Sequence, residues 1–135
     1  MTNEAKETSV TPVGVGLLGM GVVGSGVASI LTEKRLQLEH LVGRPLSLEG
    51  VLVRNTTKPR SYEASDYLLT TDAEQILNNP KIDVVVEVMG GQIPALDLIL
   101  KSISLGKHIV TANKEVMAQH GPDILALARK KGVQV

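Results

Sequence analysis

Apolar residues in this chain form short aliphatic runs that alternate with longer segments of helical spacing. A short run of Val, Ile and Leu bounded by glycine or polar residues is typical of a strand buried on both faces of a sheet. Apolar residues that recur every three to four positions are typical of a helix instead. By these rules we expect strands at residues 13–18, 46–53, 67–70, 82–88 and 108–111, and the opening of a further strand at 133–135.

Helices are expected between these strands, and residues that start or stop helices mark their ends. Gly43-Arg44-Pro45 ends the first helix, Asp72 caps the second and Pro94 opens the third. Gly106 and Gly132 stand just past the last two helices. The expected helices span residues 22–41, 73–77, 94–105 and 122–131. Strands that alternate with helices predict an α/β fold with a doubly wound, Rossmann-like parallel sheet.

The segment Gly19-Met20-Gly21-Val22-Val23-Gly24 follows the first expected strand directly and opens the first helix. In this context G-x-G-x-x-G is the dinucleotide-binding fingerprint. Gly19 permits the tight turn, Gly21 leaves room for a pyrophosphate, and Gly24 lets the helix pack closely on the strand. The helix N-terminus directs N–H groups and a partial positive charge at the phosphates. The alternative is a glycine-rich turn that only packs a helix on a sheet.

The amino-acid composition limits the classes of function that this chain can have. The 135 residues are a one-domain length, with no Cys, Phe or Trp and with 14 basic and 14 acidic residues. These counts exclude disulfides and thiolate metal sites, and they argue against nucleic-acid and membrane partners. No apolar run reaches the ~18 residues of a membrane span. We expect a disordered tail at residues 1–11 without a signal peptide, a dinucleotide-binding domain at 12–135, and a cytoplasmic location.

The end of the second strand bears on the choice of cofactor. In this fold it meets the adenosine ribose, and NAD sites usually place an acid there. This strand ends before Arg54, with Lys58 nearby, whereas Glu49 lies about 13 Å back along the strand. A guanidinium suits a 2′-phosphate, so NADP is favoured and NAD remains possible. The alternative is that these cations belong to an ordinary solvated loop.

Two further loops follow the fourth and fifth strands. Met89, Gly90 and Gly91 follow Glu87, and the two glycines let the nicotinamide side of a cofactor approach the backbone. We prefer a structural role for Glu87, bonded to nearby N–H groups, over that of a catalytic base. Lys114 could polarise a carbonyl or stabilise an alkoxide, although such a lysine is more often a solvated surface residue. The histidines show no ligand spacing, and no metal site is expected.

Three segments together resemble the N-terminal domain of homoserine dehydrogenase: residues 15–24, 85–91 and 106–114. The resemblance implies NADP- or NAD-dependent interconversion of aspartate 4-semialdehyde and homoserine, on the route to threonine, isoleucine and methionine. It places Lys114 at the active site and Arg54 at the 2′-phosphate. The residues expected to contact the cofactor are Gly19, Gly21, Val22, Val23, Gly24, Arg54, Lys58, Met89, Gly90, Gly91, Thr111, Asn113 and Lys114.

The family continues into a substrate and dimerisation domain that this sequence does not contain. We therefore expect a fragment that binds cofactor without turnover, whose parent is a homodimer acting on homoserine or aspartate 4-semialdehyde. Two other readings stay open at this point. One is another oxidoreductase of the same fold, such as aspartate-semialdehyde dehydrogenase, and the other is a non-catalytic nucleotide-sensing module.

Overall fold

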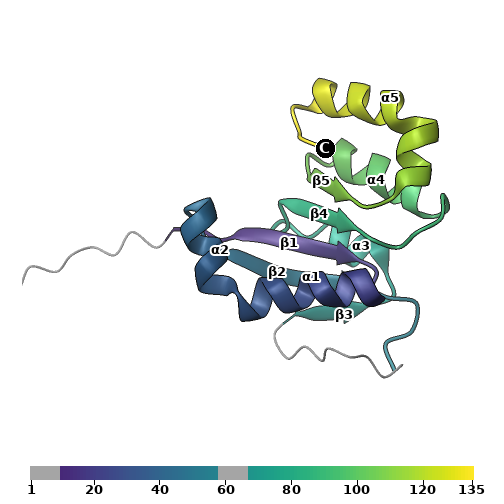
Figure 1. The fold of residues 1–135 in the computed structure, drawn as a ribbon. Helices are drawn as coiled ribbons and strands as arrows, with labels where there is room; N and C mark the ends of the chain where they lie inside the picture. The colour runs from purple at the N-terminus through teal and green to yellow at the C-terminus, as the bar shows by residue number, and fades with distance from the viewer. Residues whose placement is uncertain (1–9, 58–66) are drawn as a thin grey trace, which may run out of the picture.

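The structure is a computed structural model that describes residues 10–57 and 67–135 (Figure 1). Most of the expected tail at 1–11, and Lys58 in the loop after the second strand, lie outside the described residues. Thr11 is described, and its carbonyl oxygen accepts hydrogen bonds from Arg44 Nε at 3.1 Å and Nη2 at 2.7 Å. The chain is therefore anchored from this point on.

A single parallel sheet forms the centre of the domain. Its five strands run in the order β3-β2-β1-β4-β5, and every neighbouring pair is parallel. Their bounds are β1 Val13–Leu18, β2 Leu46–Leu52, β3 Leu68–Thr70, β4 Val84–Glu87 and β5 His108–Thr111. The expected doubly wound α/β fold is confirmed.

Helices cover both faces of the sheet, which is what a strand pattern without polar alternation requires. Their bounds are α1 Val22–Glu33, α2 Arg35–Val42, α3 Ala73–Leu77, α4 Ala95–Ser104 and α5 Lys114–Lys131. Alternate residues of β1 face opposite cores: Leu17 packs with Ala28 and Leu31 of α1, whereas Leu18 packs with residues of α3, α4 and α5. Figure 1 shows α1 across one face of the sheet and α3 on the other.

Most of the predicted bounds agree with the structure within two residues, but three elements differ more. The helix expected at 22–41 is interrupted at Lys34, whose backbone leaves the helical region, and α2 beyond it buries no residue. The last helix begins at Lys114 rather than at Pro122, because the Asn113 side chain caps it and Pro122 is accommodated inside. Residues 133–135 form no strand, although Ile109 N donates to the Gln134 carbonyl oxygen at 2.9 Å. None of the helices in the described ranges is long and apolar enough to cross a membrane.

A buried lysine lies at the edge of the sheet opposite the strand ends that carry the glycine turn. Lys107 Nζ donates to the carbonyl oxygens of Asn79 at 2.9 Å and Ile82 at 2.6 Å, and the residue is 7% exposed. Burial lowers the pKa of Lys107, and the nearby Asp83 carboxylate opposes that shift. The ammonium group therefore satisfies two carbonyl oxygens in the turn that leads into β4.

We expect Lys107→Met to lower the free energy of unfolding by about 1–3 kcal/mol, because it removes the ammonium donor from the buried Ile82 carbonyl oxygen and leaves the Asn79 carbonyl oxygen with Ile82 N alone. Urea denaturation followed by circular dichroism measures the change. Lys101→Met is the matched control, since Lys101 forms an exposed ion pair with Glu74, and such pairs contribute little. Equal stability losses in the two variants would contradict this role of Lys107.

Candidate nucleotide-binding site

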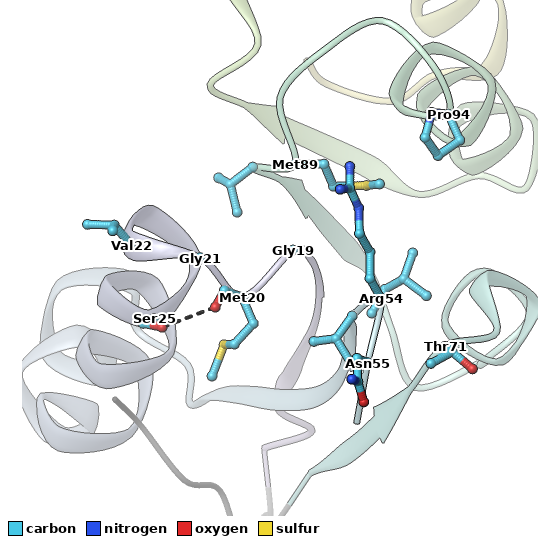
Figure 2. A pocket seen from close by; sticks show the side chains of 13 residues that line it. Gly19, Met20, Gly21, Val22, Ser25, Arg54, Asn55, Thr71, Met89 and Pro94 are labelled. Atoms are coloured by element: carbon cyan, nitrogen blue, oxygen red, sulfur yellow. Dashed lines mark hydrogen bonds between the residues drawn. The ribbon is translucent and has the colours of Figure 1, made fainter. Parts of the chain in front are cut away.

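A cleft of about 740 Å³ opens at the carboxyl ends of the central strands (Figure 2). It is formed by the turn after β1, the end of β2 and the loop after β4. Its volume lies in the range of small-molecule and cofactor pockets, about 300–1,000 Å³. Ligands of doubly wound sheets bind at this edge, beside the point where the order of the strands reverses. In this sheet that point lies between β1 and β4.

The geometry of the glycine turn agrees with the three roles assigned to it. Gly19 has a φ of +104°, which side chains rarely permit. A Cβ at position 24 would lie 2.2 Å from the carbonyl oxygen of Gly19, so Gly24 allows the helix to approach the turn. A Cβ at Gly21 would meet no atom within 4 Å, which leaves open space where a pyrophosphate would lie. Gly21 is also the N-cap of α1 and supplies no side-chain cap, so the first N–H groups of that helix are available to phosphates.

One positively charged side chain lines the cleft at the end of β2. The Arg54 side chain extends along the cleft toward Met89, and Asn55 lies beside it (Figure 2). No carboxylate lines the cleft within the described residues. Glu49, the acid of β2, instead accepts a hydrogen bond from Ser47 Oγ at 2.8 Å. The residues present therefore fit a dinucleotide, with the positive charge of Arg54 at the end of β2.

Glu87 ends β4 and is completely buried. Its Oε1 accepts a hydrogen bond from Met89 N at 2.8 Å, and its Oε2 accepts one from Thr111 Oγ1 at 2.6 Å. Both carboxylate oxygens are thus engaged with the protein itself. This arrangement favours the structural role over that of a base exposed to substrate.

Asn113 connects the loop after β4 with the start of α5. Its Nδ2 donates to the Gly91 carbonyl oxygen at 2.6 Å, while its Oδ1 accepts from Val116 N at 3.1 Å. Gly90 and Gly91 have φ values of +77° and +70°, so the loop needs glycine for its backbone conformation. The two glycines therefore have a conformational role in the loop, and the close approach of a cofactor to their backbone stays a prediction.

Lys114 is the first residue of α5 and is exposed. The predicted cofactor residues divide into two groups. Those that line the cleft are Gly19, Gly21, Val22, Arg54 and Met89. Those that are described but lie outside its lining are Val23, Gly24, Gly90, Gly91, Thr111, Asn113 and Lys114.

The cleft also includes residues that the sequence analysis did not single out. Met20 and Ser25 belong to the glycine turn and α1, and Ser25 Oγ donates to the Met20 carbonyl oxygen at 3.4 Å. Thr71 follows β3, so the rule that ligands meet the carboxyl ends of strands could have identified it. Among the described residues, no three His, Cys, Asp or Glu side chains gather as metal ligands would.

Comparison with known proteins identifies the family. Residues 19–135 match the model of the homoserine dehydrogenase NAD-binding domain. The chain belongs to the homoserine dehydrogenase family. Homoserine dehydrogenase of Synechocystis is 46% identical over 123 residues, which cover 91% of this chain and 28% of that protein. The Bacillus subtilis enzyme is 39% identical over 121 residues, which cover 90% of this chain and 28% of that protein.

Solved homoserine dehydrogenases share the same fold. The Staphylococcus aureus enzyme at pH 6.0 aligns with a TM-score of 0.85 and 38% identity over 93% of this chain and 32% of its own. The Thiobacillus denitrificans enzyme aligns with a TM-score of 0.86 and 38% identity over 93% of this chain and 29% of its own. The chain thus spans less than a third of these homoserine dehydrogenases. The resemblance seen in the sequence is confirmed, and these matches favour this family over aspartate-semialdehyde dehydrogenase.

Proposed function

We propose that this chain is the cofactor domain of an NADP(H)-dependent homoserine dehydrogenase. That enzyme interconverts aspartate 4-semialdehyde and homoserine by hydride transfer, and NAD(H) is a weaker alternative cofactor here. The observation that carries the cofactor preference is Arg54, which stands in the cleft at the end of β2 where no carboxylate is found among the described residues. A guanidinium can bind a 2′-phosphate through paired, charge-assisted hydrogen bonds, whereas an acid there would repel it.

The parts of the cofactor are assigned to the site by the order of the strands. The adenosine ribose lies at the end of β2 beside Arg54, and the pyrophosphate lies over Gly21 at the N-terminus of α1. The nicotinamide then lies on the other side of β1, toward the loop after β4 and the end of β5. When bound, the nicotinamide supplies hydride chemistry, and this chain's residues hold and orient it.

The rest of the enzyme is proposed to supply the substrate site. The resemblance implies a homodimer that acts in the cytoplasm, with homoserine or aspartate 4-semialdehyde held by a domain outside this sequence. The 135-residue chain alone would then bind cofactor without turning over substrate. Lys114 is assigned to the substrate oxygen, which it would help to bind or protonate.

We expect Arg54→Ala to weaken NADPH binding by about 1.5–3 kcal/mol, roughly 10- to 150-fold, with NADH affinity nearly unchanged. The loss follows from removal of hydrogen bonds to a charged phosphate that only NADPH carries. Isothermal titration calorimetry of both cofactors measures it. Arg44→Ala is the control, because Arg44 bonds Thr11 away from the cleft. Equal losses for NADPH and NADH would show that Arg54 does not distinguish them.

A further inference from the structure

A continuous series of hydrogen bonds runs from the loop after β4 to the start of α5. It begins at Met89 N, passes through the Glu87 carboxylate to Thr111 Oγ1 at 2.6 Å, and continues to Asn113 N at 3.0 Å. The Asn113 side chain then returns to the same loop by donating to the Gly91 carbonyl oxygen. Strands β4 and β5 are joined at this point by side chains as well as by the sheet.

The direction of these hydrogen bonds depends on the charge of Glu87. Thr111 Oγ1 accepts from Asn113 N, and its single proton is donated to Glu87 Oε2. Met89 N donates to the other carboxylate oxygen. An ionised carboxylate, which only accepts, matches both donors, whereas an amide would present a donor to Thr111. Among the described residues Glu87 has no ion-pair partner, so electrostatic pairing does not explain an acid at this buried position.

The two ends of this network lie in the loop after β4 and at the N-terminus of α5. Met89 lines the cleft, and Gly90 and Gly91 beyond it have positive φ values and open space around their Cβ positions. At the other end the network reaches Asn113, which caps α5 immediately before Lys114. The carboxylate thus joins the two segments assigned to the nicotinamide.

We propose that Glu87 is a positioning residue for the nicotinamide end of the cofactor. It fixes the Met89–Gly91 backbone against the first turn of α5, and so sets how the ring is held without contacting it. This inference rests on the proposed function, because it assumes a dinucleotide with its adenosine end at Arg54. It concerns the loop after β4, whereas Arg54, the residue proposed to bind the 2′-phosphate, follows β2.

The test compares two ligands on this chain and on Glu87→Gln, which keeps the shape of the side chain and removes its charge. NADPH carries the nicotinamide, and 2′-phospho-ADP-ribose lacks it. We expect Glu87→Gln to weaken NADPH about three- to tenfold, the effect of about one lost hydrogen bond, and to leave 2′-phospho-ADP-ribose within about twofold. The fluorescence increase of bound NADPH should fall as well, since it reports how firmly the ring is held.

Two further variants separate positioning from a general effect on stability. Glu49→Gln makes the same chemical change in β2, where Glu49 bonds Ser47 outside the cleft lining, and should leave both affinities unchanged. Asn113→Asp keeps the acceptor for Val116 N but loses the donor to Gly91, so it should reproduce the selective loss for NADPH. Because Asn113→Asp retains the helix cap, it remains informative if Glu87→Gln fails to fold.

Each outcome separates this inference from the proposed function. If Glu87→Gln weakens the binding of both ligands equally, the positioning role is overturned and the proposed function stands. The same conclusion follows if Glu87→Gln weakens the binding of neither ligand while the unmodified chain binds NADPH more tightly than 2′-phospho-ADP-ribose. Equal affinity of the unmodified chain for the two ligands also overturns the positioning role. If the unmodified chain binds neither ligand, the proposed function fails, and this inference fails with it.

Discussion

Replacing Lys114 with alanine in the proposed full-length enzyme is expected to lower kcat by about 10²–10⁴-fold, the usual effect of losing a general acid–base group. Cofactor affinity should change little, because Lys114 does not line the cleft. The lysine follows β5, on the side of the sheet assigned to the nicotinamide. From there its ammonium group would bind or protonate the substrate oxygen as hydride is transferred.

The position of Lys114 in α5 argues against a merely structural role. It is the first helical residue, where the helix macrodipole disfavours a cation by about 0.3–1 kcal/mol. Its side chain is exposed and forms no ion pair within the ranges that the structure describes. Neither helix stability nor packing therefore accounts for a lysine at this site.

Steady-state kinetics with homoserine and NADP⁺ measure this prediction. Lys130→Ala is the matched control, because Lys130 is exposed in the last turn of the same helix. The 135-residue chain alone should show no homoserine oxidation, because the domain proposed to hold a small amino acid at the ~3–3.5 Å that hydride transfer needs lies outside this sequence. A normal kcat in Lys114→Ala would return Lys114 to the class of solvated surface lysines.

Gly21→Val is expected to abolish measurable cofactor binding, a loss of at least about 100-fold or 2.7 kcal/mol, without unfolding the domain. In the ligand-free chain a Cβ at this position meets no atom within 4 Å, so the fold accommodates it. The valine side chain would instead occupy the space assigned to the pyrophosphate. Calorimetric titration with NADPH and a thermal melt of the same sample separate binding from folding.

Gly26→Val provides the control for this substitution. Gly26 lies on α1, is exposed, has open space at its Cβ position and does not line the cleft. The Gly26→Val variant should bind NADPH with the same affinity as the unmodified chain. Unchanged NADPH affinity in Gly21→Val would place the dinucleotide elsewhere on the domain.

The sequence by itself determined the parallel sheet and the glycine turn. Both depend on local chemistry: aliphatic runs such as Val84–Glu87 favour strands buried on both faces, and the turn after β1 needs a glycine at position 19 for its positive φ. The position of Arg54 was determined by local sequence as well, because Arg54 follows the end of β2 and so lies at the ligand edge of the sheet.

The start of the last helix and the hydrogen bond from Thr111 to Glu87 were decided only by the tertiary structure. Pro122 is a common helix-starting residue, yet α5 begins earlier because Asn113 caps it and Val116 is buried against the core. The bond from Met89 N to Glu87 is local and agrees with the expected bonding to nearby N–H groups, whereas Thr111 lies on a different strand, 24 residues away in sequence. No local pattern encodes such pairings, because they form only when β4 and β5 lie side by side and their carboxyl ends share one edge.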